Sequence, residues 1–377
     1  MARSRWLLST LAGAAAALGA AWLLPAHAQE GPAAAPAGPR SPEEIDARTQ
    51  RAITRGLDYL ARHQEANGAF IDGIGRKVNN QYLATIGPHV GVTALAGMAF
   101  LSNGSTPGRG PYGKQVQGCV DFVKNCVNPQ GFVTNQESRM YSHAFATLFL
   151  AEVYGMAPSG DVRAALQRAV GLIVKAQNEQ GGWRYLPGAK DSDISITVCQ
   201  VQALRAANNV GVQVPKETIE AAVRYVKRSY VGPGGSGYHG QPGGFWYQVY
   251  ENQPLRPSRT SFALTAAGVT ALYGAGEYDG PEIRGGLQFL FNPRNRPARH
   301  DMKQTFDYFY GHYYAIQAFF QAGEPYWSQW YGMLRDELLW GQQPDGHWRD
   351  LVGANYATSM ACVILQIPYR YLPIFER

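Results

Sequence analysis

Polar side chains that can bind or transfer protons stand near the beginnings of several otherwise apolar segments of this 377-residue chain. They are two histidines, an aspartate and a serine: His143, His312, Asp193 and Ser261. If the segments are helices, free backbone N–H groups and the positive ends of the helix dipoles lie beside these side chains, which suits an anionic or hydroxyl-rich ligand. The alternative is structural: the side chains bond one another, water and the helix ends, with Asp193 or Ser195 as an N-cap.

Aromatic residues crowd one of these apolar segments. Tyr310, Tyr313 and Tyr314 flank His312, and tryptophans follow them. Aromatic rings can line a ligand site, because their faces stabilise cations and their flat bodies pack on lipid tails or sugars. Ordinary core packing is the other interpretation. The sequence marks six candidate ligand-binding residues, namely His143, Ser261, Tyr310, His312, Tyr313 and Tyr314.

A repeated unit must position these residues. A Gln is followed six residues later by a large aromatic residue, and a Gly lies one or two residues before the aromatic. The Gly permits a turn, the aromatic residue covers the end of a hairpin, and the Gln can bond free backbone groups at a helix end, so we assign the unit a structural role. The pairs are Gln64 and Phe70, Gln177 and Trp183, and Gln342 and Trp348, with Cys126 in the Gln position before Phe132.

Two kinds of helix are expected to alternate along this repeat. Before the motif, segments such as 161–177 and 215–230 carry an apolar stripe at helical spacing and charges elsewhere, which is typical of an outer layer. After the motif come nearly uncharged segments that are apolar all round, which indicates helices buried on all sides. These inner segments are 90–101, 140–153, 195–204, 261–272, 309–320 and 357–367.

The alternation predicts an all-α fold: an α/α6 toroid with two concentric layers, built from about six helical hairpins over residues 43–377. The outer partner of the fifth repeat, 283–291, has the weakest pattern. The Gly-rich segment 232–244 is expected to be a long surface loop.

The repeat resembles that of a known family. QNEQGGW at 177–183 and QQPDGHW at 342–348 resemble the repeat shared by protein prenyltransferase β-subunits and by squalene and oxidosqualene cyclases. The segments 192–212 and 311–327 resemble exported, single-domain prenyltransferase/squalene-oxidase-repeat proteins of bacteria. The resemblance covers roughly residues 45–377 and implies an α/α toroid with a central, often aromatic-lined cavity. It specifies the fold better than the function.

The resemblance also implies two kinds of chemistry. Triterpene cyclases protonate their substrate with the middle Asp of a D-x-D-D motif; the similar stretch here makes Asp193 the proton donor and Asp191 its neighbour, with Ile194 in place of the last Asp. Those cyclases use two helical domains, whereas this chain has one. Protein prenyltransferases hold zinc through Asp, Cys and His, and His312 has a loosely similar context. The preceding repeat supplies neither Asp nor Cys, so we predict no metal and no cofactor.

Three functions are consistent with these residues. The first is a binding or scaffold protein whose cavity or mouth holds an apolar, isoprenoid or glycan ligand. The second is an enzyme that acts on a polyprenyl or terpenoid substrate, with Asp193 as general acid. The third is a glycan-active enzyme, which requires two carboxylates facing each other, and the inner segments offer few acids.

The first 42 residues are expected to be targeting and linker sequence. Arg3 and Arg5 precede an apolar, Ala-rich stretch, and the sequence AHA at 26–28 is a small-x-small cleavage site. We therefore expect a signal peptide over 1–28, an Ala/Pro-rich linker over 29–42 and an exported protein, periplasmic or extracellular. An uncleaved membrane anchor is the alternative.

The net charge limits the classes of binding partner. The net charge is +6 and the basic residues are scattered, so we predict no nucleic-acid partner, while an anionic membrane or cell-wall surface fits the mild positive charge.

Cys119 and Cys126 lie seven residues apart in a helical segment, roughly 10 Å, too far to bridge. Buried thiols are expected for the four cysteines, with a long-range disulfide as the alternative. The sequence does not specify an oligomeric state.

Overall fold

The computed structural model of the chain describes residues 45–78, 81–235, 240–250, 258–297 and 307–376. All of them belong to the second of two compact units, Pro39–Arg377. The predicted signal peptide and linker lie outside the described residues. In the described part, none of the helices is long and apolar enough to cross a membrane.

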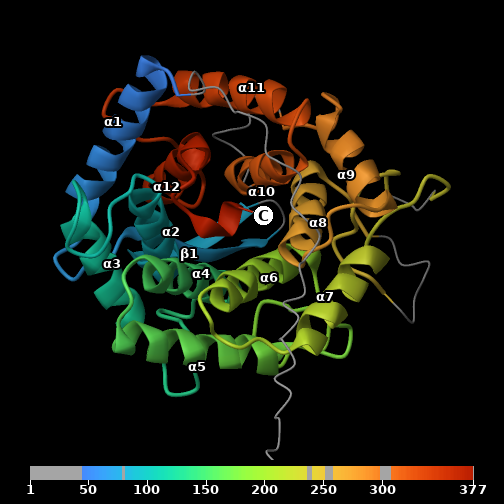
Figure 1. Cartoon of the computed structure of the whole chain (residues 1–377), viewed down its shortest axis with the longest axis horizontal. Helices are drawn as coiled ribbons and strands as arrows, with labels where there is room; N and C mark the ends of the chain where they lie inside the picture. Colours follow the sequence, from blue (N-terminus) through green and yellow to red (C-terminus); the bar gives the residue numbers. More distant parts are fainter. Residues whose placement is uncertain (1–44, 79–80, 236–239, 251–257, 298–306, 377) are drawn as a thin grey trace, which may run out of the picture. The chain divides into compact units, whose positions relative to one another are not determined.

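Twelve α-helices in the described residues alternate between an outer and an inner layer (Figure 1). The outer helices are α1 (Ala47–His63), α3 (Gly113–Asn125), α5 (Gly160–Ala176), α7 (Lys216–Arg228), α9 (Pro281–Phe291) and α11 (Tyr326–Gly341). The inner helices are α2 (Val90–Leu101), α4 (Met140–Met156), α6 (Ile194–Asn209), α8 (Phe262–Gly274), α10 (Asp307–Ala322) and α12 (Ala354–Gln366). The last inner helix packs on both α1 and α2, so the ring closes. The predicted all-α toroid is therefore confirmed.

The apolar pattern of each helix explains its layer. Every residue of α2 is buried, as expected for a helix that is apolar all round and has neighbours on all sides. By contrast α1 buries only one stripe, which includes Ile53, Leu57 and Leu60, and turns its arginines to solvent. Hydrophobic burial thus sorts the two kinds of helix into two concentric layers.

The motif glutamine ties consecutive outer helices together. The side-chain amide of Gln342 donates to the carbonyl of Gly346 in its own turn at 2.9 Å and to the carbonyl of Ala52 in α1 at 2.8 Å, which joins the last repeat to the first. Two other glutamines bridge in the same way, Gln64 to Gly68 and Gln115, and Gln177 to Gly181 and Thr218.

The motif glycine is required because the next outer helix comes too close for a side chain. Gly181 has a φ of +89°, and a Cβ there would lie 2.3 Å from the carbonyl oxygen of Ala221 in α7. We expect Gly181→Ala to lower the free energy of unfolding by at least about 2 kcal/mol. Gly171→Ala is the matched control, because this exposed position within α5 has open space, and it should be neutral or stabilising by up to about 1 kcal/mol. Equal effects of the two substitutions in urea unfolding would contradict this account.

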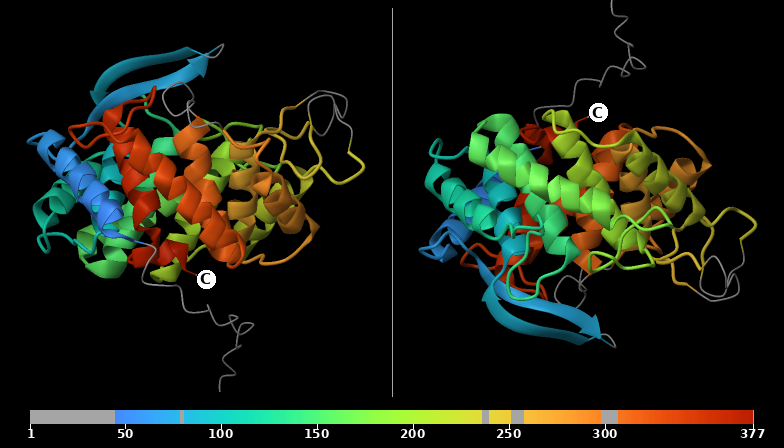
Figure 2. Two further views of the ribbon diagram at one scale, coloured as in Figure 1. Left: turned by 90° about the horizontal axis from the view of Figure 1, so that it is seen from above. Right: turned by 90° about the horizontal axis from the view of Figure 1, so that it is seen from below.

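A two-stranded hairpin that the sequence analysis did not predict marks one end of the ring. β1 (Ile71–Val78) and β2 (Gln81–Pro88) pair antiparallel, with Ile71 opposite Pro88, and β2 leads directly into α2. Figure 2 shows the hairpin at one end of the ring and the C-terminal segment at the other. We call the hairpin end, where the inner helices begin, the amino end, and the opposite end the carboxyl end.

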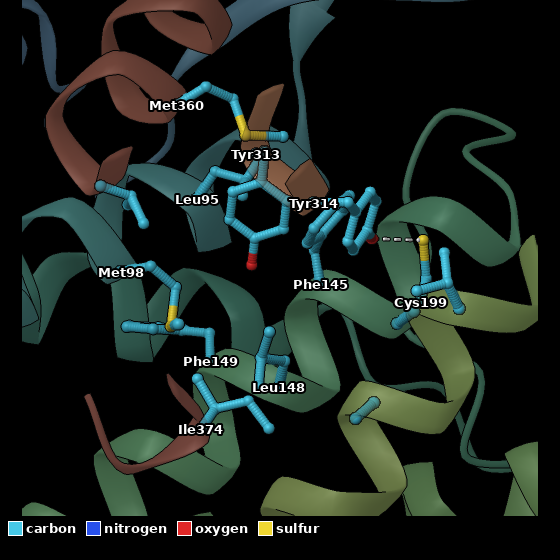
Figure 3. Close-up of a cluster of buried hydrophobic side chains, with 14 of the residues drawn as sticks. Leu95, Met98, Phe145, Leu148, Phe149, Cys199, Tyr313, Tyr314, Met360 and Ile374 are labelled. Carbon is cyan, nitrogen blue, oxygen red and sulfur yellow. Dashed lines mark hydrogen bonds between the residues drawn. The ribbon is translucent and has the colours of Figure 1, made fainter. Parts of the chain in front are cut away.

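Side chains fill the centre of the ring. Figure 3 shows Met98, Phe149 and Met360 from inner helices around the side chain of Tyr313, and all of them are buried. Ile374, in the short 3-10 turn Pro373–Phe375, enters the same cluster from the carboxyl end. The resemblance implied a central cavity, whereas this apolar cluster occupies the middle of the described structure. A groove of about 530 Å³ lies on the outer side, between α3, α4 and α5.

The cysteines follow the buried-thiol interpretation. All four are free, and Cys119, Cys199 and Cys362 are buried, while Cys126 is half-buried. Burial raises the pKa of the Cys199 thiol to about 12, which makes it unreactive.

Candidate functional site

Asp193 is the N-cap of α6 at the amino end. Its side chain is fully buried, and Oδ1 accepts hydrogen bonds from the backbone N–H of Ile196 at 2.9 Å and from the hydroxyl of Ser195 at 2.6 Å. Ser261 caps α8 in the same way, accepting from the backbone N–H of Leu264 at 3.2 Å. The capping interpretation is therefore confirmed for Asp193, and the structure shows Ser261 as a further cap.

An arginine neutralises the second oxygen of Asp193. The Nε of Arg184 lies 3.2 Å from Oδ2, and another nitrogen of the same guanidinium pairs with Asp191. Burial raises the pKa of Asp193 to about 6, although the hydrogen bonds from Ser195 and Ile196 and the charge of Arg184 oppose that rise. The guanidinium of Arg184, the hydroxyl of Ser195 and the backbone N–H of Ile196 thus hold this carboxyl group in place at the start of α6.

Four partly exposed tyrosines surround this carboxylate. Tyr141 donates to the hydroxyl of Ser195 at 2.6 Å, and Tyr310 donates to the carbonyl of the same residue at 2.8 Å. The hydroxyls of Tyr185 and Tyr247 share a hydrogen bond. We call these four residues the tyrosine cluster; it presents ring faces and hydroxyls together at the amino end.

Two further carboxylates lie at the amino end beside the hairpin. Asp72, on β1, accepts from the backbone N–H of Tyr356 at 2.6 Å. Asp350 accepts from the N–H of Val352 at 2.9 Å through Oδ1, while its Oδ2 has no hydrogen-bond partner in the described structure. Burial is the main cause that raises the pKa of both aspartates to about 7.

The sequence analysis missed Asp72 and Asp350, but the repeat contained a signal for them. Each lies two residues after a motif aromatic, Phe70 or Trp348. In an extended segment, residues i and i+2 point to the same side of the chain. The residue two positions after the motif aromatic therefore has a fixed direction in every repeat. Tyr185 holds the same position after Trp183, and Tyr247 holds it after Phe245.

The candidate histidines lie between the helix layers and not with this group. His143 Nδ1 accepts the backbone N–H of Val133 at 3.0 Å, where other repeats use a threonine, as Thr197 does for Trp183. His312 is buried among the rings of Phe262, Tyr308 and Trp330.

The last two candidates, Tyr313 and Tyr314, lie among the buried side chains of the inner helices. Tyr313 belongs to the central cluster, and the Tyr314 hydroxyl lies 3.0 Å from the sulfur of Cys199 (Figure 3). Of the residues selected from the sequence, the structure brings Asp191, Asp193 and Tyr310 together. Within the described ranges, no three His, Cys, Asp or Glu side chains are placed to hold a metal ion.

Buried acids give the fold a pH dependence of defined sign. The raised pKa values of Asp72, Asp350 and Glu152 (about 8 for the last) mean that the folded chain keeps protons that the unfolded chain has released. The free energy of unfolding should therefore fall as the pH rises from 7 to 9. Three histidines have lowered pKa values and act in the opposite direction only at lower pH, where the unfolded chain binds their protons: His89, His143 and His312.

Asp350→Asn should weaken this dependence, because it removes one of the titrating groups. Because the pKa of Asp350 is raised to about 7, its contribution changes mostly below pH 7. Urea unfolding of the wild type and the variant at pH 5 and pH 8 measures it, since the contributions of the histidines cancel in the comparison. The same change in stability between the two pH values in both proteins would contradict the assignment.

Comparisons with known proteins place the fold. No protein-family model matches the chain, and no curated protein matches its sequence. The apo structure of the type II terpene cyclase MstE from Scytonema matches with a TM-score of 0.56 and 13% identity, covering 86% of this chain and 99% of that one. The GH76A α-1,6-mannanase from Salegentibacter sp. HEL1_6 matches with a TM-score of 0.59 and 9% identity, covering 86% and 99%.

A protein from Actinoplanes matches with a TM-score of 0.55 and 16% identity, again covering 86% and 99%. At such identities the likeness concerns the fold and not the activity. The chain therefore has a terpenoid-cyclase-like α/α toroid fold, which it shares with a terpene cyclase and with a mannanase.

Proposed function

We propose that the chain binds a carbohydrate at the amino end of the ring. The observation that carries this proposal is the tyrosine cluster, whose four side chains are partly exposed beside carboxylates and an arginine. Sugars present apolar C–H faces and hydroxyl groups, so they fit amphipathic tyrosines with polar neighbours. The buried side chain of Gln248 supports the site from below, donating to Asp191 at 3.1 Å.

The packed centre makes an isoprenoid ligand a weaker proposal. An isoprenoid chain needs an apolar space, and the described inner helices fill theirs with buried side chains. The fold itself supports either ligand class, since a matching cyclase structure holds geranylgeranyl dihydroxybenzoate and a matching mannanase structure holds α-1,6-mannotriose. The choice therefore depends on the side chains of this chain.

Binding to a panel of oligosaccharides, measured by calorimetry, tests the proposal. Tyr247→Ala should weaken the binding of any ligand found by about tenfold or more, which corresponds to about 1.4 kcal/mol. Tyr371→Ala is the matched control, because Tyr371 is an exposed tyrosine at the carboxyl end, and it should leave the affinity unchanged. Failure of every oligosaccharide to bind, or equal affinities of the two variants, would overturn the proposal.

Recovering the oligosaccharide after incubation with the protein distinguishes binding from cleavage. Asp72, Asp193 and Asp350 bring three carboxyl groups to the amino end, and a glycan-active enzyme requires two that face each other. We propose a binding function, so the bound oligosaccharide should be recovered intact. Shortened products would instead establish a glycan-active enzyme.

We also propose that the protein is exported, on the strength of the targeting sequence in residues 1–28. Expression in a bacterial host should give a mature chain that begins at Gln29. An intact N-terminus on the purified protein would count against export by cleavage.

A further inference from the structure

Arg259 lies beside the tyrosine cluster at the amino end. Arg259 is exposed, and its guanidinium carbon lies 5.1 Å from the centroid of the Tyr247 ring. The guanidinium carbon of Arg184 lies 5.8 Å from the same ring, but Arg184 is paired with Asp191 and Asp193. In the described structure no carboxylate pairs with Arg259, and its side chain is exposed beside the tyrosine cluster.

Backbone pairing fixes the segment that carries Arg259. The backbone N–H of Tyr247 donates to the carbonyl of Arg259 at 2.9 Å, and Trp246 pairs with Thr260 next to it. The arginine therefore lies on a segment fixed to the tyrosine that it stacks on. A guanidinium that rests on an aromatic ring loses little further freedom when its edge binds a ligand.

A planar fork of donors matches a carboxylate, which accepts two parallel hydrogen bonds from arginine. We propose that Arg259 binds the carboxylate of a uronic acid residue, so that the amino end recognises an acidic glycan. This inference rests on the proposed function and gives its ligand a chemical class.

The charges around the tyrosine cluster permit an anionic ligand. Asp191 and Asp193 carry two negative charges, and Arg184 and Arg259 carry two positive charges, so the ion pairs with Arg184 leave Arg259 to attract the ligand. Two other carboxyls of the amino end, Asp72 and Asp350, contact the loop before α12 and its first turn, and not the tyrosine cluster. Asp307, at the start of α10, acts on Asp350. Electrostatic attraction of this kind should weaken as salt is added.

Matched ligand pairs test the inference. The probes are oligomers of galacturonate, glucuronate and mannuronate, each beside its carboxyl-reduced, neutral counterpart. At least one acidic oligomer should bind the wild-type protein about tenfold more tightly than its neutral counterpart, and the preference should shrink in high salt. Arg259→Gln should weaken the binding of the acidic oligomer about tenfold more than that of the neutral oligomer, so that the preference disappears.

Two further variants separate charge from geometry. Arg259→Lys keeps the charge but not the fork, so it should retain only part of the preference. Arg163→Gln, at an exposed position on the outer helix α5, is the control and should behave as wild type.

The outcomes separate the inference from the proposed function. If neutral and acidic oligomers bind equally, or if Arg259→Gln keeps the preference, the carboxylate site is wrong while carbohydrate binding stands. Tighter binding of a sulfated oligomer than of any uronate would overturn the assignment to a carboxylate. If no oligomer of either kind binds, the inference and the proposed function both fall.

Discussion

Replacing Trp183 by Ala is expected to lower the free energy of unfolding by about 3–5 kcal/mol, as measured by urea denaturation. Trp183 is fully buried, and its indole N–H donates to the carbonyl of Ile173 in α5 at 2.7 Å. Its backbone N–H donates to the hydroxyl of Thr197 in α6. The substitution removes the side chain that packs between an outer and an inner helix and leaves a cavity in its place.

Trp340 provides the matched control for this substitution. It is the same residue type on an outer helix, but 60% of it is exposed. Trp340→Ala should change the free energy of unfolding by no more than about 0.5 kcal/mol. Comparable losses in the two variants would show that burial in the motif position is not what stabilises the ring.

Replacing Asp193 by Ala is expected to lower the free energy of unfolding, measured by urea denaturation, by about 3 kcal/mol. The variant loses the N-cap of α6 and leaves the Nε of Arg184 without its buried partner. Asp193→Asn keeps an oxygen that can accept from the backbone N–H of Ile196 and should cost about half as much.

The same pair of variants separates the cap from an acid catalyst. If Asp193 acts through the fold, Asp193→Asn should keep the carbohydrate affinity of the wild type at temperatures where the variant is folded. A variant that is stable but binds or turns over nothing would indicate a direct chemical role for this carboxyl group.

The layers of the fold were predictable because a helix that is buried on all sides has an apolar sequence all round. Helix α2 begins and ends at the residues that its apolar run predicted, 90–101, since a helix surrounded by neighbours has no polar face. The hairpin 71–88 was not predicted, because its glycines and mixed side chains follow neither helical spacing nor a clean alternation. Its position depends on long-range contacts such as the bond from the N–H of Gly73 to the carbonyl of Val352.

The candidate site was predictable only in part. Asp193 was found because it stands at the start of an inner helix, where polar groups gather, and Tyr310 because aromatic residues crowd its segment. His143 and His312 stand at similar positions, but a helix apolar all round does not reveal which of its sides faces the outer layer. Arg259 carries no sequence signal at all, because its role depends on the ring of Tyr247 beneath it.

The resemblance predicted a central cavity, but buried side chains occupy the centre of the ring. The repeat motif implies the ring, and the ring size implies a hole, but the hole is filled by residues outside the motif. Ile374 reaches the centre because Gln321 in α10 and Arg205 in α6 bond the backbone carbonyls of Phe375 and Glu376. Only the folded chain brings this terminal segment beneath the inner helices.

Hydroxyl-radical footprinting with and without a bound oligosaccharide tests the central claim most directly, since it reports which tyrosines a ligand covers. A ligand at the amino end should protect Tyr185, Tyr247 and Tyr310 from oxidation and leave Tyr371 at the carboxyl end unchanged. Protection confined to the carboxyl end, or none at the three amino-end tyrosines while ligand is bound, would contradict the account.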